Sequence, residues 1–178
     1  MAYRNEFRVI AGMWRHRRCV FPARQGLRPT PDRVRETLFN WLAPRLAGAR
    51  CLDLFAGSGA LGMEALSRGA REVEFVEKDA ETAAAIEGNL AALGGAARVV
   101  VADSLGYLSG APKPYDIVFL DPPFGTALLT IACERLAAGW LRTGARVYLE
   151  YPAAIGIPAL PAGWRLLRQK RAGQVGFA

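Results

Sequence analysis

The sequence predicts an α/β protein built on a doubly wound, mostly parallel sheet of seven strands. Short apolar segments alternate with helical segments from residue 50 onward, and a glycine-rich turn follows the first of them. Two strand-like segments also lie close together near the C-terminus. Apolar strands separated by helices are typical of a parallel sheet covered on both faces. The two terminal strands predict an antiparallel hairpin at one edge.

Hydrophobic patterning gives the bounds of these elements. The expected strands span 50–55, 73–77, 98–102, 116–120, 145–151 and 164–170, with one more short strand near the C-terminus. The expected helices span 59–68, 80–93, 104–109 and 126–138.

The segment before this sheet predicts a small β-hairpin and a helix. Short strands at 7–10 and 19–21 flank a basic turn. Thr30-Pro31-Asp32, with Thr30 as the N-cap, marks the start of the helix, and Pro44 marks its end. The apolar face of this helix carries Val34, Leu38, Trp41 and Leu42. Its other positions include Arg33, Arg35 and Glu36.

Positive charge is concentrated near the N-terminus. The chain has 178 residues and a formal net charge of +7, and its first 50 residues hold eleven arginines against three acidic residues. This distribution indicates a polyanionic partner, such as nucleic acid, that docks at one end. We therefore divide the chain into a basic RNA-binding extension at 1–46 and a main domain at 47–178.

Composition argues against several classes of protein. His16 is the only histidine, and the three cysteines lie far apart. The sequence therefore offers few ligands for a zinc site and only one histidine for a Ser-His-Asp triad. We therefore expect no bound metal. No apolar run approaches the ~20 residues that span a bilayer, and the N-terminus lacks the apolar segment of a secretory signal. We expect a monomeric cytoplasmic protein with reduced thiols and no membrane partner.

The glycine-rich turn raises the question of which cofactor it holds. Gly57, Gly59 and Gly62 form the pattern G-x-G-x-x-G, which is typical of dinucleotide binding. Glu77 follows at the distance expected of an acid that binds ribose hydroxyls, so these features fit NAD. Asp53 does not fit NAD, because its carboxylate would face a pyrophosphate of like charge. S-adenosylmethionine instead carries an ammonium and a sulfonium group, which a carboxylate stabilises.

A third acidic position follows the next expected strand. Asp103 and Ser104 are placed there to bind the edge of an adenine. Each acid also has a purely structural interpretation: Asp53 caps a turn, Glu77 pairs with a nearby cation, and Asp103 caps the following helix. Acids at three successive strand ends favour a cofactor site over three separate coincidences.

The segment Asp121-Pro122-Pro123-Phe124 follows an apolar strand and reaches the same edge of the sheet. Asp121 can accept a hydrogen bond from an exocyclic amine, and the carbonyl of Pro122 is a second acceptor. The two prolines fix the backbone, and Phe124 offers a flat face on which a base stacks. Two acceptors on the N–H groups aim the amine lone pair at an electrophilic methyl group. The alternative is a simple tight turn.

These motifs resemble the Rossmann-type, or class I, S-adenosylmethionine-dependent methyltransferases, and among them the amino-methyltransferases with a [DN]-P-P-[FYW] motif. Five segments extend the resemblance over about residues 8–124: RVIAGMWRHRR, GLRPTPDRVRETLFNWL, CLDLFAGSGALGMEALSRGA, FVEKD and DIVFLDPPF. Together they are similar to the bacterial RsmD-type family, which methylates the N2 amine of a guanine in small-subunit ribosomal RNA.

The resemblance implies S-adenosylmethionine as cofactor and 16S ribosomal RNA, in the small subunit or an assembly intermediate, as partner. The implied cofactor-binding residues are Asp53, Phe55, Gly57, Gly59, Glu77, Lys78, Asp103 and Ser104. The implied catalytic residues are Asp121, Pro122, Pro123 and Phe124. The implied RNA-binding residues are Arg15, Arg17, Arg18, Arg28, Arg33 and Arg35. His16 departs from the family, which more usually has glycine there, so we expect a differently shaped hairpin turn.

Other functions stay open. A DNA adenine-N6 methyltransferase uses the same D-P-P-F motif, although such enzymes usually carry a separate domain for base recognition. A non-catalytic RNA-binding protein is expected to have lost the cofactor acids or D-P-P-F, and neither is lost. An NAD-linked oxidoreductase needs a proton donor, for which His16 and Tyr107 are weak candidates. The basic segment 165–171 either extends the RNA surface or is a solvated strand face.

Overall fold

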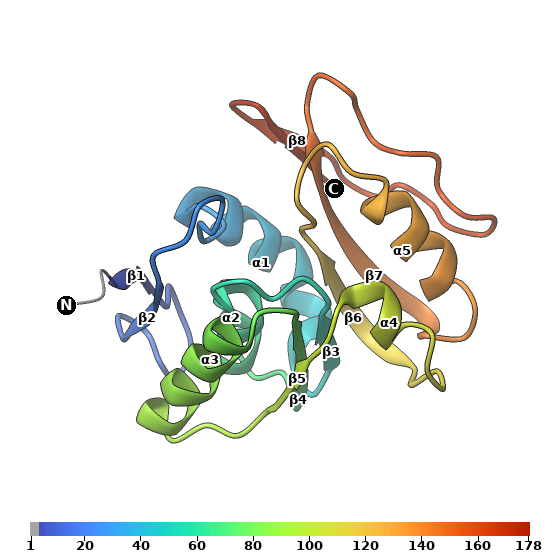
Figure 1. Cartoon of the computed structure of the whole chain (residues 1–178). Coiled ribbons are helices and arrows are strands. Elements are labelled where there is room, and N and C mark those ends of the chain that lie inside the picture. The colour runs from blue at the N-terminus through green and yellow to red at the C-terminus, as the bar shows by residue number, and fades with distance from the viewer. Residues whose placement is uncertain (1–3) are drawn as a thin grey trace.

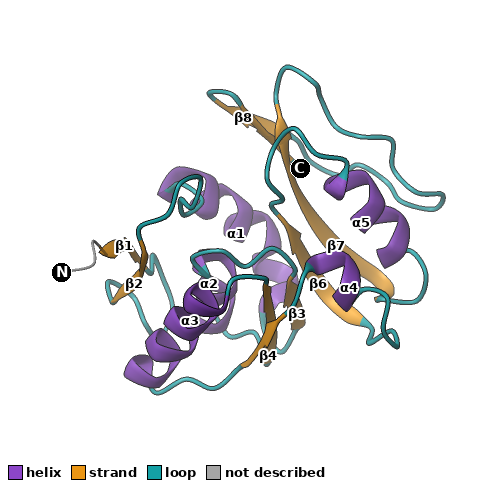
Figure 2. Ribbon diagram, viewed as in Figure 1, coloured by secondary structure: helices purple, strands orange, loops and turns teal. Residues whose placement is uncertain are grey.

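The computed structural model describes residues 4–178 and centres on one seven-stranded sheet (Figures 1 and 2). The strands follow the order β5-β4-β3-β6-β7-β9-β8. β3 to β7 run parallel to one another, whereas β9 is antiparallel to β7 and β8. The bounds are β3 Arg50–Asp53, β4 Glu72–Glu77, β5 Arg98–Val101, β6 Tyr115–Leu120, β7 Leu141–Pro152, β8 Lys170–Ala172 and β9 Val175–Phe177. The predicted fold class, including the antiparallel edge hairpin, is confirmed.

Helices cover both faces of this sheet, because successive side chains of a strand point to opposite faces. On one face, Cys51 and Phe119 join a buried cluster with α1, α2, α3 and the N-terminal hairpin. On the other face, Leu52 and Leu120 join a second cluster with α4 and α5. The helix bounds are α1 Asp32–Leu46, α2 Ala60–Ser67, α3 Ala80–Leu93, α4 Ser104–Tyr107 and α5 Leu128–Leu136. Figure 1 shows the two helical layers on either side of the strands.

The N-terminal hairpin forms a separate two-stranded antiparallel sheet from β1 (Arg4–Arg8) and β2 (Arg18–Pro22). It packs on α3, where the Asn89 side-chain oxygen accepts from the Val20 N–H at 3.0 Å and the Asn89 amide donates to the Val20 carbonyl at 2.8 Å. Phe7 and Trp14 of the hairpin are buried in the same cluster as the sheet. The extension thus shares a core with the main domain, and the division at residue 46 stays a prediction.

A buried ion pair joins the hairpin, α1 and α2. Arg35 and Glu64 are both fully buried, and a guanidinium nitrogen of Arg35 lies 3.3 Å from a Glu64 carboxylate oxygen. Arg35 also donates to the carbonyls of Arg8 and Thr30. The Glu64 carboxylate accepts the backbone N–H groups of residues 10 and 11 from the hairpin. Arg35 was predicted to lie off the apolar face of the helix and to bind RNA, and that prediction was wrong because its side chain is fully buried and pairs with Glu64.

Both predicted ends of α1 were also wrong. Pro31 occupies the N-cap position with no side-chain cap, and Thr30 lies one residue earlier. Pro44 lies inside the helix, which continues to the buried Leu46. A proline this close to the end removes only one hydrogen bond, and burial of Leu46 offsets that loss.

The strand predicted at 164–170 does not form. Residues 153–169 consist of turns and irregular backbone, and β8 begins only at Lys170. Leu166 and Leu167 are both exposed, with 44% and 50% of their surface in solvent, so the segment lacks the alternation of a half-buried strand.

Glu64→Gln is expected to lower the free energy of unfolding by about 3 kcal/mol, because it removes the buried partner of Arg35 and leaves only the exposed carboxylate of Asp32 to balance the buried guanidinium. Urea denaturation measures this change. The control is Glu6→Gln, which breaks the exposed pair with Arg18 and is expected to change stability by less than about 1 kcal/mol. Equal effects of the two substitutions contradict the central role of the buried pair.

His16 is the only non-glycine residue with a positive φ among residues 4–178, at 66°. A side chain in this region is strained by about 1 kcal/mol or more. His16→Gly is therefore expected to raise the melting temperature, while His16→Ala keeps the strain and gives no gain. A melting temperature that falls in the glycine variant shows that the imidazole makes a compensating contact.

Candidate cofactor and substrate site

Three of the predicted acids follow neighbouring strands at the carboxyl edge of the sheet. Asp53 ends β3 and is in register with Phe75 of β4 and Phe119 of β6. Glu77 and Asp121 each lie two residues beyond these partners, so they follow Asp53 along the same edge. Ligands of open α/β sheets bind beyond the carboxyl ends of the strands. The sheet thus brings together residues that the sequence separates by up to 68 positions.

The glycine turn between β3 and α2 has the shape expected of a ligand-binding loop. Gly57 and Gly59 have φ of 52° and 79°, and Gly59 is the N-cap of α2. Gly62 serves packing instead, because a Cβ atom there would lie 2.2 Å from the Phe75 ring. The glycines therefore let α2 pack close to the sheet. The backbone amide groups at the start of α2 then face the carboxyl ends of the strands.

Asp53 is buried at the base of this loop, with 2% of its surface exposed. One carboxylate oxygen accepts the Gly62 N–H at 3.0 Å, a free donor in the first turn of α2. Burial nevertheless raises the pKa of Asp53 to about 7, against the lowering effect of the Gly62 bond. A buried carboxyl group that resists ionisation is suited to a cationic ligand, whose charge favours its anionic form.

Glu77 supports the glycine loop from the side. Its carboxylate accepts the Gly57 N–H at 2.8 Å and the Asp79 N–H at 2.9 Å. Phe55 is partly buried against the α4–α5 cluster, and Lys78 is exposed beside Glu77. The ribose-binding role of Glu77 stays a prediction, since its oxygens lie on the loop that is expected to hold the cofactor.

Asp103 caps α4, as its structural interpretation predicted. It accepts the Gly106 N–H at 2.8 Å, and Ser104 behind it is buried. The Asp103 carboxyl group remains at the solvent surface beyond β5. Its binding to an adenine edge stays a prediction.

The D-P-P-F segment leaves the end of β6 as a short loop. Asp121 is partly buried, Pro122 is buried, and Pro123 is exposed. Phe124 exposes 45% of its surface, which is unusual for a phenylalanine and leaves its ring open to a partner. The Thr126 hydroxyl donates to the Pro123 carbonyl at 2.9 Å and braces the loop.

Sequence reasoning missed one further carboxyl group at this edge. Glu150, near the end of β7, is buried beside Asp121 and accepts the Tyr148 hydroxyl at 2.8 Å. The signal was available, because an acid near the end of the apolar segment VYLEYP is unusual in a buried strand.

Five of the six predicted RNA-binding arginines are exposed: Arg15, Arg17, Arg18, Arg28 and Arg33. Arg17 donates to the carbonyl of Ala92, and Arg18 pairs with Glu6 at 3.2 Å. Arg35 is the exception and is withdrawn from this set, because a fully buried guanidinium cannot reach a phosphate.

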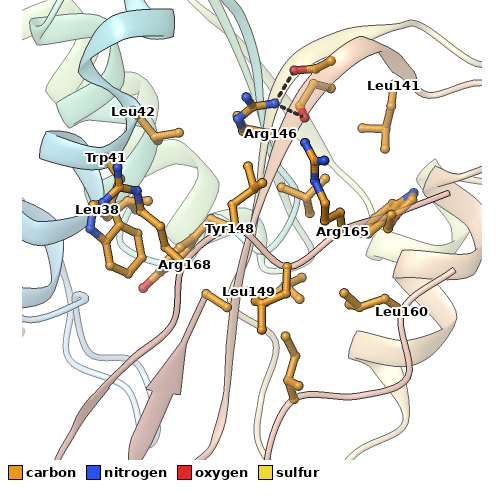
Figure 3. Close-up of a pocket in the computed structure, with 18 of the residues that line it drawn as sticks. Leu38, Trp41, Leu42, Leu141, Arg146, Tyr148, Leu149, Leu160, Arg165 and Arg168 are labelled. Carbon is orange, nitrogen blue, oxygen red and sulfur yellow. Dashed lines mark hydrogen bonds between the residues drawn. The ribbon is translucent and has the colours of Figure 1, made fainter.

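A cavity of about 500 Å³ lies away from this site, between α1, β7 and the segment 157–168 (Figure 3). Trp41, Arg146, Arg165 and Arg168 border it. None of the predicted cofactor-binding or catalytic residues lines it.

No helix within residues 4–178 is long and apolar enough to cross a membrane. In the same range, no group of three or more histidine, cysteine or carboxylate side chains is arranged to hold a metal ion.

The parallel sheet, the glycine turn and the helical layers define the Rossmann-like fold of class I methyltransferases. A putative methyltransferase from Escherichia coli superposes with a TM-score of 0.91 at 45% identity, covering 97% of this chain and 96% of that one. A 16S rRNA N2 G1207 methyltransferase from Thermus thermophilus, solved with AdoMet and guanosine, shares the fold with a TM-score of 0.69. Its identity is 23%, and the match covers 99% of this chain and 50% of that one.

The family follows from closer relatives. The family model described as Conserved hypothetical protein 95 matches residues 7–178. Ribosomal RNA small subunit methyltransferase D of Escherichia coli is 48% identical over 97% of this chain and 88% of its own length. The protein of the same name from Haemophilus influenzae is 42% identical over 98% of this chain and 93% of its own length. The chain belongs to this family of ribosomal RNA methyltransferases.

Asp53→Asn is expected to stabilise the protein more at pH 8 than at pH 5. The pKa of Asp53 is about 7 in the folded state and near 3.9 in an unfolded chain. Between these values the folded state holds a proton that the unfolded state releases, so the contribution of Asp53 to stability falls as pH rises from about 4 to 7.

Asparagine keeps an acceptor for Gly62 and removes the charge. Urea denaturation at both pH values is expected to show an extra gain on the order of 2 kcal/mol at pH 8. Parallel stability curves for the variant and the native protein contradict the raised pKa.

Proposed function

We propose that the protein transfers a methyl group from S-adenosylmethionine to the exocyclic N2 amine of a guanine in 16S ribosomal RNA. The observation that carries this proposal is the meeting of Asp53, Glu77 and Asp121 at one sheet edge, beside the exposed Phe124. The names of the relatives support the RNA substrate. The monomeric state and the cytoplasmic location stay predictions.

The residues at this edge fit a cationic cofactor. Carboxyl groups surround the glycine loop, and the loop lets the backbone approach a ligand closely, since side chains are absent at Gly57 and Gly59. Asp53 would balance the ammonium and sulfonium charges of S-adenosylmethionine, Glu77 would bind its ribose hydroxyls, and Asp103 with Ser104 would bind its adenine. Phe55 and Lys78 are the remaining residues that would contact the cofactor. When bound, S-adenosylmethionine supplies an electrophilic methyl group on a positively charged sulfur.

The D-P-P-F loop positions the target amine. Asp121 and the Pro122 carbonyl accept its two N–H groups, and Phe124 stacks on the purine. The amine lone pair then points along the line of displacement, so catalysis comes from orientation rather than from a strong base. The target base is unpaired or extruded from its helix, and the five exposed arginines of the extension bind the surrounding phosphates.

The first test is methyl transfer from radiolabelled S-adenosylmethionine. Small ribosomal subunits lacking the modification, deproteinised ribosomal RNA and duplex DNA are offered in parallel, and the labelled nucleoside is identified. Label in N2-methylguanosine from a ribosomal substrate supports the proposal. Label in N6-methyladenine from DNA overturns the substrate while keeping the fold and the cofactor.

Asp121→Ala is expected to reduce transfer by about 100-fold or more, by analogy with the loss of one preorganised polar contact to a reacting group. Calorimetry with S-adenosylhomocysteine is expected to show nearly unchanged cofactor affinity. Glu87→Ala, which removes an exposed carboxylate on α3, is the control and leaves both values unchanged. Equal losses of transfer and of cofactor affinity in the Asp121 variant contradict its assigned role.

A further inference from the structure

Asp121 and Glu150 form a carboxyl pair across two strands. Leu120 of β6 is in register with Leu149 of β7; Asp121 directly follows β6, and Glu150 is the next residue of β7. Side chains alternate between the faces of a sheet, so both acids lie on the face that carries the paired rings of Phe119 and Tyr148. Two buried carboxyl groups this close repel each other when both are ionised, so one of them holds a proton.

The surroundings decide which of the two carries it. Glu150 accepts the Tyr148 hydroxyl at 2.8 Å. A hydroxyl donor stabilises the anionic form of a carboxyl group. The proton therefore belongs on Asp121.

The charges that face the pair agree with this assignment. Burial, the charge of Glu150 and the charge of Asp53 on β3 all raise the pKa of Asp121 well above its usual range. Burial also raises the pKa of Glu150, but the hydrogen bond from the Tyr148 hydroxyl acts in the opposite direction. Tyr148 itself stays a donor, because burial and the charge of Glu150 raise the pKa of its hydroxyl.

We propose that Glu150 is a positioning residue that holds Asp121 as a neutral carboxylic acid, with the Asp121 hydroxyl donated to Glu150 and its carbonyl oxygen turned to the substrate amine. This rests on the proposed function. The amine nitrogen forms the bond to the methyl carbon, and the carbon–sulfur bond breaks with its electron pair on sulfur. The cationic amine product then loses a proton to water, and Asp121 keeps its own proton throughout.

With a neutral Asp121, asparagine at this position is expected to retain most of the activity. An amide group donates to Glu150 through its nitrogen and accepts the amine N–H through its oxygen, as the neutral acid does. Asp121→Asn is therefore expected to keep kcat within about tenfold of the native enzyme, whereas Asp121→Ala loses about 100-fold or more. Deprotonation of Asp121 at high pH creates two facing anions and lowers kcat, and this decline is expected to vanish in Asp121→Asn.

Glu150→Gln replaces the anion by a neutral amide and is expected to lower kcat with little change in the affinity for S-adenosylhomocysteine. Tyr148→Phe, which removes one donor to Glu150, is expected to have a smaller effect in the same direction. An Asp121→Asn variant that is as inactive as Asp121→Ala, yet folded and able to bind S-adenosylhomocysteine, shows that Asp121 acts as a base and overturns the proposal.

A second readout needs no activity. NMR titration of protein labelled with ¹³C at aspartate carboxyl carbons, with Asp121→Asn to assign the signal, follows the Asp121 proton directly. The expected midpoint lies well above 4 and falls in Glu150→Gln. A titration midpoint of Asp121 at the usual aspartate pKa in the native protein overturns the proposal. Absence of methyl transfer by every variant, with the raised midpoint intact, refutes the proposed function and leaves the carboxyl pair standing.

Discussion

The buried pair of Arg35 and Glu64 is the contact on which the arrangement of the site depends. It fixes the start of α1 against α2, and the same guanidinium holds the carbonyl of Thr30 at 3.1 Å. The Glu64 carboxylate also accepts two backbone N–H groups of the hairpin. Breaking a buried ion pair by removing one partner is strongly destabilising. The N-terminal extension is thereby tied to α2, the helix that follows the glycine turn.

The second constraint is the crowding of acids at the carboxyl ends of the strands. Four carboxyl groups, from Asp53, Glu77, Asp121 and Glu150, gather where a parallel sheet places ligands. The protein limits their repulsion with backbone amides on Asp53 and Glu77 and with the Tyr148 hydroxyl on Glu150. Burial nevertheless raises the pKa of three of the four, Asp53, Asp121 and Glu150. The positive charge of the cofactor reduces the repulsion among these carboxyl groups. This explains why a stable fold keeps several acids at one edge of the sheet.

Local patterns in the sequence were sufficient to predict the sheet, the glycine turn and the D-P-P-F loop. The alternation of apolar residues sets the strands, and the G-x-G-x-x-G spacing sets the turn into α2. The roles of Arg35 and Glu150 could not be predicted, because their partners Glu64 and Asp121 each lie 29 positions away in the sequence. The strand predicted at 164–170 does not form, since only Trp164 packs against the sheet and its apolar neighbours Leu166 and Leu167 are exposed.

A crystal structure with S-adenosylhomocysteine and guanosine bound together tests the assignment of this site most directly. We expect the thioether beside Asp53 and the glycine loop, the guanine stacked on Phe124, and its N2 nitrogen within hydrogen-bond distance of Asp121 and the Pro122 carbonyl. A guanosine bound elsewhere, with the D-P-P-F loop empty beside an occupied cofactor site, contradicts the assignment of this edge as the place of methyl transfer.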